Sequence, residues 1–406
     1  MTKQQSFSFF GQRAVQSLRD AGYRNTAYAL GELVDNSLQE GATHVDILVA
    51  EERVVAGRAR HWRVKGIGVL DNGNGMDATV LRRALRIGDG TRFEKPGGMG
   101  KFGVGLPQAS ISQCQRVDVW SWQNGPKKAL NAHIDLTDPA WIAANEVPKP
   151  SKSPLPEPWA AVPGALPLAE SGTFVLWTKL DRLKWVTSRS LFTNSERLIG
   201  RMYRYWLHGE APKATIRMIA FDAESKTIRD TWMFRPNDPL YLMEGTSVDR
   251  PPVDPMFEKW GEPMKLKYNV DGRQEVVTLR FSIAKKKARA VGPDGVQAGK
   301  MPHGHDAKRN RGLSIVREGR ELDLDTKWVR SDDPRERWWG AEVSFGRGLD
   351  EIFGVTNNKQ NAHALSDFAA KDFEDLRTSP DETRQAVHDR LKNEDFTSYI
   401  LLDVSE

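Results

Sequence analysis

The hydrophobic pattern of residues 1–135 alternates between helical and strand spacing, and this alternation restricts the fold more than any other feature of the chain. Apolar residues recur at helical spacing from Thr26 to Glu40, with Asn25 placed to cap the start and Gly41 after the end. Strand-like segments follow at 44–50 and 62–70, a helix begins after Asp77, and a short helix at 106–114 precedes strands at 116–122 and 129–136. The pattern predicts a domain of interleaved helices and strands.

The rest of the chain divides into an irregular segment, a helix and a strand-rich half. Eight prolines between Pro139 and Pro167 predict an irregular insert at about 139–170, because proline is excluded from central strands. A strand at 172–180 and a helix at 191–208 follow. The second half contains strand patterns at 214–221, 227–234, 275–283, 312–316 and 320–324, and a helix at 380–391. We therefore expect two domains, 1–210 and 211–406.

Composition excludes several classes of protein. Hydrophobic residues make up 39% and charged residues 28% of the chain, which is typical of a globular protein rather than a disordered one. No apolar run approaches the roughly 18 residues that span a bilayer, and the start of the chain lacks the pattern of a signal peptide, so we expect a cytoplasmic protein without a membrane partner. The single cysteine, Cys114, rules out an internal disulfide and is expected in the core. A net charge of +5 permits a phosphate or nucleic-acid partner without requiring one.

The early helix carries a polar group at Glu32-Leu-Val-Asp35-Asn36. At 100° per residue, Asp35 and Asn36 lie on the side of Glu32, opposite the apolar stripe. A glutamate beside a bound water can act as a general base, and an asparagine oxygen is a suitable Mg²⁺ ligand. The alternative interpretation is a solvated helix face.

Asp71-Asn-Gly73-Asn-Gly75-Met76 ends the second strand. Two glycines let the backbone approach a ligand closely, and the neighbouring carboxylate can accept a hydrogen bond from an exocyclic amine. An ordinary turn is the alternative.

Five glycines occupy the nine positions from Gly97 to Gly105, directly before a helical segment. Backbone N–H groups followed by a helix N-terminus form an anion cradle that suits a triphosphate, and Lys101 adds a positive charge. The segment is not a P-loop, because no Gly-Lys-Ser/Thr ending is present. A plain mobile loop is the alternative. Two further short motifs, Gly172-Thr173 and Asn357-Asn-Lys359-Gln360, carry little information by themselves.

Glu32-x-x-Asp-Asn36, Asp71-x-Gly-x-Gly75, Gly98 to Gly105 and Gly172-Thr173 together resemble the four nucleotide-binding motifs of the GHKL ATPase superfamily, which contains gyrase, heat-shock chaperones, histidine kinases and MutL. The resemblance implies a Bergerat-type α/β sandwich of the α+β class in residues 1–210, with ATP and Mg²⁺ as cofactors.

The resemblance also implies roles for single residues. Glu32 resembles the general base, Asn36 the Mg²⁺ ligand, and Asp71 the partner of the adenine amine, assisted by Thr173. Gly73, Gly75 and Met76 resemble the residues beside the base. A larger set resembles the lid and phosphate loop: Gly98, Gly100, Lys101, Phe102, Gly103, Val104 and Gly105.

The second half resembles the transducer domain of gyrase, MutL and MORC proteins at Gly312 to Arg320, with a tight hairpin predicted at 317–319. Lys359 resembles the transducer lysine that reaches the γ-phosphate and assists catalysis. In such proteins ATP closes two subunits into a dimer. The resemblance therefore implies a MORC-like ATPase that acts on double-stranded DNA, in a prokaryotic defence or restriction system with further protein partners.

Several alternatives remain open at this point. Basic stretches at 285–289 and 308–311 can contact DNA phosphates or can be solvated loops. A heat-shock-type chaperone is the main alternative function, although the chain shows no acidic linker. A histidine kinase is disfavoured because only 31 residues precede Glu32. A non-hydrolysing ATP-gated module would lack the base, so Glu32 argues against it.

Overall fold

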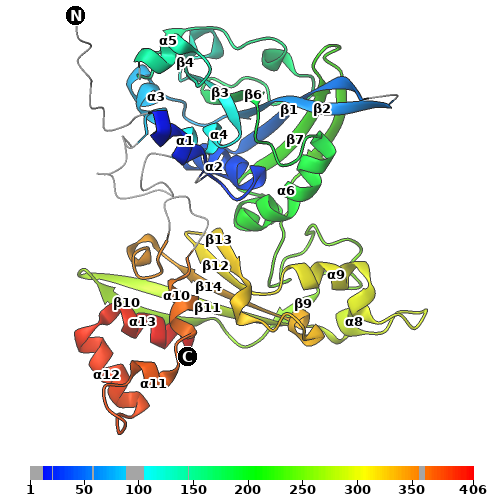
Figure 1. Cartoon of the computed structure of the whole chain (residues 1–406). Coiled ribbons are helices and arrows are strands. Elements are labelled where there is room, and N and C mark those ends of the chain that lie inside the picture. Colours follow the sequence, from blue (N-terminus) through cyan, green and yellow to red (C-terminus); the bar gives the residue numbers. More distant parts are fainter. Residues whose placement is uncertain (1–11, 21, 57–58, 88–104, 145, 356–361) are drawn as a thin grey trace, which may run out of the picture. The chain divides into compact units, whose positions relative to one another are not determined.

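The computed structural model describes residues 12–20, 22–56, 59–87, 105–144, 146–355 and 362–406. The chain forms two compact units (Figure 1): residues 1–199 with 213–234 form unit 1, and residues 200–212 with 235–406 form unit 2. Both units combine helices with a mixed sheet, as the α+β expectation required. The expected single boundary at residue 210 is wrong in one respect, because residues 213–234, which follow it, belong to unit 1.

Unit 1 is built on an eight-stranded sheet in the order β5-β4-β3-β6-β2-β1-β7-β8. Its strands are β1 (His44–Ala56), β2 (Ala59–Asp71), β3 (Cys114–Trp122), β4 (Leu130–Asp135), β5 (Ser151–Lys152), β6 (Gly172–Leu180), β7 (Thr215–Asp222) and β8 (Ile228–Met233). Its helices are α1 (Gln12–Asp20), α2 (Thr26–Gln39), α3 (Ala78–Ala84), α4 (Gly105–Ile111), α5 (Pro139–Ala144) and α6 (Ser188–Met202), the last of which ends in unit 2.

The hairpin β7–β8 is the part of unit 1 that the sequence assigned to the second domain. β7 pairs with β1 in parallel, with His44 opposite Thr215 and Glu51 opposite Asp222, whereas the other neighbouring strands of this sheet run antiparallel. A parallel partner needs a long crossover, which α6 supplies. Because that pairing joins segments about 170 positions apart, strand periodicity could not reveal it.

The proline-rich segment closes one face of this sheet. Trp159 packs against Phe174 and Phe221, with ring centroids 5.9 and 5.2 Å apart. Leu155 and Val162 join the same buried cluster. The segment is irregular, as expected, but it supplies core side chains rather than only a surface insert. Helices α2 and α4 contact the sheet at β2 and β3.

Local signals in the sequence account for several element ends. The side chain of Asn25 accepts hydrogen bonds from the backbone of Ala27 and Tyr28 and caps α2, and Asp77 caps α3. Cys114 begins β3 instead of ending a helix, because α4 stops at Ile111. It is fully buried, which raises the pKa of its thiol and agrees with a core role.

Unit 2 contains a six-stranded sheet in the order β10-β11-β14-β12-β13, with β9 paired to β11. Its strands are β9 (Phe257–Lys259), β10 (Met264–Val270), β11 (Arg273–Ala284), β12 (Leu313–Arg317), β13 (Arg320–Asp325) and β14 (Trp339–Phe345). Its helices are α7 (Arg204–Leu207), α8 (Lys286–Arg289), α9 (Pro302–Arg309), α10 (Ala364–Ala369), α11 (Phe373–Leu376), α12 (Arg384–Glu394) and α13 (Phe396–Ser405).

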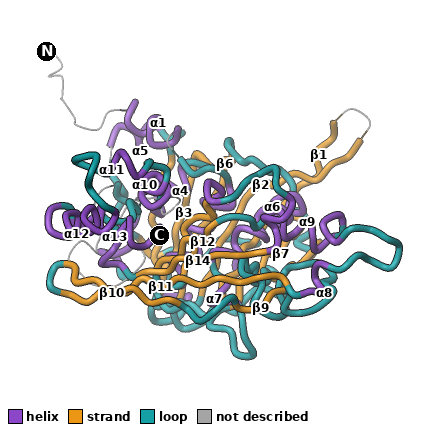
Figure 2. The backbone as a smooth tube through the Cα atoms, turned by 90° about the horizontal axis from the view of Figure 1, so that it is seen from below, coloured by secondary structure: helices purple, strands orange, loops and turns teal. Residues whose placement is uncertain are grey.

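The two faces of the second sheet differ in polarity. Helices α10, α12 and α13 lie together (Figure 2) and share an apolar cluster with strand residues such as Val277, Ile315 and Val343. The alternate positions carry buried charges instead, around Arg204 of α7. The expected hairpin between β12 and β13 is confirmed, with Glu318 and Gly319 at positive φ in the turn. Within the described ranges, no helix combines the length and hydropathy needed to cross a bilayer.

Candidate functional site

The polar side chains of α2 are buried, not solvated. Glu32 is 5% exposed and Asp35 is fully buried. Helix α2 contacts both α4 and β2, so that residues on both sides of the helix are covered. Asn36, one position further along, is half-buried. Because both carboxylates are buried and Asn36 is half-buried, the interpretation as a solvated helix face is wrong.

Asp71 ends β2 on the floor of the site and is held by three hydrogen-bond donors. Its Oδ1 accepts hydrogen bonds from the backbone N–H groups of Gly73 at 2.9 Å and Thr173 at 3.2 Å. Its Oδ2 lies 2.8 Å from the hydroxyl of Ser37 on α2. Burial raises the pKa of the Asp71 carboxyl, while these three hydrogen bonds act in the opposite direction. The carboxyl is therefore fixed in position while one side faces a cavity.

Antiparallel pairing of β2 with β6 places Thr173 directly opposite Asp71. The sequence suggested that the Thr173 hydroxyl would join the site. Both its backbone and its hydroxyl are involved, since the hydroxyl oxygen lies 3.0 Å from Oγ of Ser121 on β3. Oγ of Ser121 also accepts a hydrogen bond from the backbone of Met76 at 2.7 Å. Three neighbouring strands and the turn after β2 are thereby joined at one point.

The two glycines of the turn after β2, Gly73 and Gly75, have different structural roles. Gly73 holds Asp71 through its N–H and is not a wall residue of the cavity. Gly75 has φ +67°, and a Cβ at this position would lie 2.0 Å from the carbonyl oxygen of Trp122. Only glycine combines that backbone conformation with so close an approach. The turn is therefore specific to this site and not an ordinary exposed turn.

Gly105 begins α4 immediately beside Glu32. A Cβ on Gly105 would lie 2.0 Å from Oε1 of Glu32. Absence of a side chain at Gly105 therefore leaves the space that the Glu32 carboxylate occupies. The start of α4 and the middle of α2 are thus fitted to each other at the carboxylate.

These residues surround a cavity of about 390 Å³. Its walls include seven of the residues singled out in the sequence: Glu32, Asn36, Asp71, Gly75, Met76, Gly105 and Thr173. Apolar walls come from residues such as Leu33, Val69 and Val175. A cavity with apolar walls and a few convergent polar groups is the usual form of a small-molecule site.

Apart from Gly73, the other ligand-contacting residues predicted from the sequence lie outside the described part of the chain. They are Gly98, Gly100, Lys101, Phe102, Gly103 and Val104 of the glycine-rich segment, and Lys359 of unit 2. Their expected roles stay predictions.

Sequence reasoning missed several residues of the site. Ser37 and Ser121 hold the floor and the turn, and Arg83 and Gln123 line the cavity. Ser37 directly follows the polar group of α2, which was a weak signal in the sequence. Ser121 and Gln123 reach the site only through pairing of β3 with β6, and no local pattern marks them.

Comparisons with known proteins agree with this geometry at the level of family. Residues 23–157 match the family described as histidine kinase-, DNA gyrase B- and HSP90-like ATPase. A search of curated proteins gives no match.

Two solved structures are similar to this chain. One is the crystal structure of the N-terminal domain of a DNA repair protein, with a TM-score of 0.48 and 12% identity, covering 87% of this chain and 93% of that chain. The other is the B subunit of the DNA gyrase from Myxococcus xanthus, with a TM-score of 0.41 and 11% identity, covering 82% of this chain and 85% of that chain.

Proposed function

Residues 23–157 belong to the histidine kinase-, DNA gyrase B- and HSP90-like ATPases, the GHKL superfamily, and from this premise we propose that the chain is a Mg²⁺-dependent ATPase whose ATP binding closes a homodimer on double-stranded DNA. One observation supports the proposal most strongly. A single cavity brings together a buried carboxylate on its floor, Asp71, with a carboxylate and an amide on one turn of α2, Glu32 and Asn36. Those are the groups needed to recognise an amine, activate water and hold a metal.

Asp71 would recognise the adenine base. Its carboxylate already accepts hydrogen bonds from the protein and has further acceptor capacity toward the cavity for an exocyclic amine. Gly75 would lie beside the flat base, because it lines the cavity at the turn after β2. Val69 and Val175 would contact its faces as apolar walls.

Glu32 would act as the general base and Asn36 would hold Mg²⁺. A metal ion of this kind neutralises phosphate charge when bound. Among the residues that the structure describes, no group of three or more histidine, cysteine or acidic side chains could hold a metal. Mg²⁺ commonly binds through one or two protein oxygens together with phosphates and water, so a single amide oxygen fits it. Lys359 and the glycine-rich segment would contact the phosphates, as the resemblance implies.

Replacement of Glu32 by alanine tests the catalytic assignment. We expect Glu32→Ala to bind a fluorescent ATP analogue with nearly unchanged affinity and to lose steady-state phosphate release by roughly 100-fold or more, the usual contribution of a general base. Glu52→Ala is the control, since this carboxylate is 40% exposed and pairs with Lys65 on the surface. Unchanged turnover in Glu32→Ala would exclude Glu32 as the base.

A basic lobe of unit 2 supports the proposed DNA contact. Helix α8 presents Lys286 and Lys287, and α9 presents Lys308 and Arg309, all of them exposed. The ring of His303 on α9 lies 3.1 Å from the carbonyl oxygen of Ala288 on α8, which packs the two helices together. The two basic stretches noted in the sequence therefore lie on one lobe, where 286–289 form α8 and 308–309 are the end of α9. Clustered lysine and arginine side chains favour phosphate contacts.

Molecular mass in solution tests the dimer and the DNA contact together. We expect a monomer without nucleotide and with ADP, a dimer with a non-hydrolysable ATP analogue, and retention of closed circular duplex DNA by that dimer. Lys286→Ala with Lys308→Ala would weaken DNA binding and its salt dependence without preventing dimerisation, whereas Lys265→Ala with Lys267→Ala, exposed on β10, would change neither.

A mass that does not respond to nucleotide would contradict ATP-driven closure and would favour the chaperone alternative. The resemblance at 312–320 is to the transducer domain of gyrase, MutL and MORC proteins, and the MORC-like branch with a role in prokaryotic defence rests on the family resemblance alone. A nucleotide-dependent dimer that does not bind DNA would contradict the MORC-like branch and would leave the ATPase assignment in place.

A further inference from the structure

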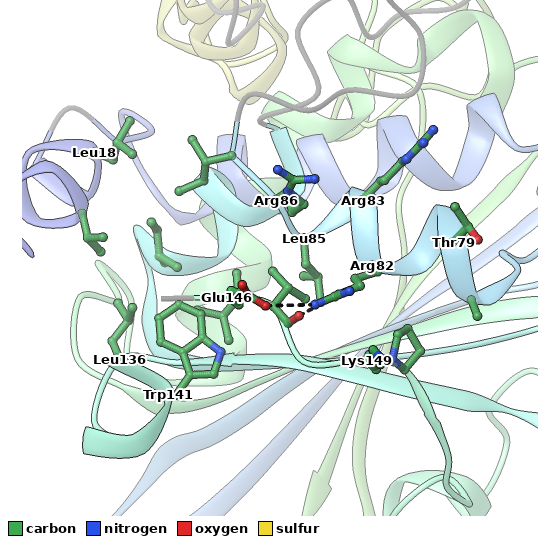
Figure 3. A pocket seen from close by; sticks show the side chains of 17 residues that line it. Leu18, Thr79, Arg82, Arg83, Leu85, Arg86, Leu136, Trp141, Glu146 and Lys149 are labelled. Carbon is green, nitrogen blue, oxygen red and sulfur yellow. Dashed lines mark hydrogen bonds and ion pairs between the residues drawn. The ribbon is translucent and has the colours of Figure 1, made fainter. Parts of the chain in front are cut away.

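Unit 1 contains a second cavity, about 840 Å³ in volume, that is separate from the candidate nucleotide site. Its walls come from α1, α3, α4, α5, β4 and residues 146–150. Figure 3 shows Leu136 and Trp141 on one side of this cavity and Thr79, Arg82 and Lys149 on the other. A volume of this size lies in the range of small-molecule sites, which is roughly 300–1,000 Å³.

Most of the wall is apolar. Four elements, α1, α4, β4 and α5, and the residues that follow α3 and β4 contribute to it: Leu18, Leu85, Ile111, Ile134, Leu136 and Trp141. Such a wall binds hydrocarbon or aromatic surface because burial of that surface removes it from water. It would not favour a small, fully polar ligand.

The polar part of the wall is strongly positive. Among the described residues of the wall, the cationic side chains are those of Arg82, Arg83, Arg86 and Lys149, and the carboxylate is that of Glu146. That carboxylate is 74% exposed and lies 3.4 Å from Nη2 of Arg82. Nε of Arg82 donates to the carbonyl oxygen of Val147 at 2.8 Å, which fixes the guanidinium at the wall. Among the wall residues that the structure describes, basic side chains therefore outnumber acidic ones.

One hydrogen-bond donor in the wall has no acceptor among the described residues. Nε1 of Trp141 is buried and makes no hydrogen bond in the described part of the protein. A buried donor without a partner costs roughly 1–3 kcal/mol. An oxygen of a bound molecule would satisfy it.

We propose that this cavity is a binding site for an amphipathic organic anion, with an alkyl or aromatic body in the apolar part and a carboxylate, sulfonate or similar group at Arg82, Lys149 and the indole of Trp141. The three observations agree on this chemistry, since the apolar wall requires a hydrophobic body, the excess cations require an anion, and the indole requires an acceptor. Fatty and aromatic acids share these properties.

Helix α3 separates this site from the candidate nucleotide site. Thr79 and Arg82 line the larger cavity, Val80 and Ala84 of the same short helix line the smaller one, and Arg83 lines both. Displacement of α3 by a ligand would change both walls. If the proposed function is right, the anion changes the affinity for ATP, and ATP changes the affinity for the anion by the same factor.

The binding test uses the full chain without nucleotide, so that its outcome does not depend on ATPase function. The probe is 1-anilinonaphthalene-8-sulfonate, an aromatic sulfonate whose fluorescence rises in apolar surroundings, and the competitors are decanoate, naphthoate, decanol and decylammonium. We expect saturable binding of the probe, displacement by decanoate or naphthoate, and at least about tenfold weaker displacement by the neutral and cationic chains. Relative strength of decanoate and naphthoate distinguishes a fatty from an aromatic acid.

Variants of residues at the cavity test whether the probe binds there. Leu136→Trp, which fills the cavity, should abolish saturable binding of the probe. Lys149→Gln should weaken the binding of decanoate by about fivefold. Lys152→Gln, on exposed β5, should have no effect. Retained thermal unfolding midpoints show that the variants fold. Equal displacement by decanol would overturn the proposal, and so would an unchanged signal in Leu136→Trp. Absence of probe binding would also overturn it, because the cavity would then be filled by the protein's own chain or by a second copy.

The coupling between the anion site and the nucleotide site is measured in a separate experiment. Saturating decanoate should change the dissociation constant of a fluorescent ATP analogue by at least about twofold, and Leu136→Trp should remove that change. An unchanged constant would refute the coupling through α3 and leave the anion site in place. Failure of the analogue to bind at all would contradict the proposed function instead.

Discussion

At the scale of single residues, Asp71 sets the charge at the floor of the candidate nucleotide site. Burial raises the pKa of its carboxyl above the ordinary value of 3.8. A carboxyl whose pKa is raised in the folded protein loses its proton at a higher pH than it does in the unfolded chain, so its ionisation lowers stability as the pH rises above 3.8. We expect ATP affinity to increase as the pH rises through the pKa of Asp71, because the ionised form is the stronger acceptor for an amine. Binding of a fluorescent ATP analogue measured against pH tests this.

Asp71→Asn separates recognition from folding. Asparagine Oδ1 can still accept from Gly73 and Thr173, and its amide can donate to Ser37, so unfolding in urea at pH 7 should show equal or greater stability. ATP affinity should fall about tenfold or more, since a hydrogen bond to a charged group is worth about 1.5–3 kcal/mol, and its pH dependence should disappear. Full affinity in this variant would remove Asp71 from base recognition.

At the scale of elements, the short helix α7 is attached to the second sheet by buried charge. Nη1 of Arg204 lies 2.7 Å from Glu321 on β13, and Nη2 lies 2.6 Å from Glu342 on β14, with all three side chains almost fully buried. Removal of one partner from such a cluster leaves uncompensated buried charge and costs about 3–5 kcal/mol. We expect Arg204→Met to lower the free energy of unfolding of unit 2 by that amount, measured by urea denaturation of the full chain.

Lys327→Met is the matched control, because Lys327 and Asp367 form an exposed pair with side-chain exposures of 57% and 64%. A pair of this kind contributes at most about 1 kcal/mol. Equal effects of Arg204→Met and Lys327→Met would show that the buried cluster does not hold α7 on the sheet.

At the scale of the whole molecule, the chain passes between the two units three times, near residues 199, 212 and 234. A fragment ending at 210 therefore lacks β7 and β8 and leaves the edge of β1 without its parallel partner. Unpaired strand edges associate with other chains. We expect fragment 1–210 to aggregate and to show no cooperative thermal transition by circular dichroism, whereas fragment 1–234 retains the eight-stranded sheet and unfolds cooperatively. Cooperative unfolding of both fragments would show that β7 and β8 are dispensable.

Features that depend on neighbouring residues could be predicted from the sequence. Asn25 and Asp77 cap their helices, and the turn at Glu318 and Gly319 joins two strands, because each depends on a side chain or backbone preference within a few positions. The order of the polar motifs was also sufficient to indicate the family, since those motifs are short and local.

Which polar groups come together in the candidate site depends on the tertiary structure. Burial of Glu32 follows from packing of α2 against both α4 and β2, and Ser121 enters the site only through pairing of β3 with β6. Placement of β7 beside β1 and of Trp159 against the sheet depends on contacts between distant segments. Hydrophobic spacing reports which side of an element is apolar but not which partner covers it, and for that reason the second cavity, which five elements enclose, had no counterpart in the sequence.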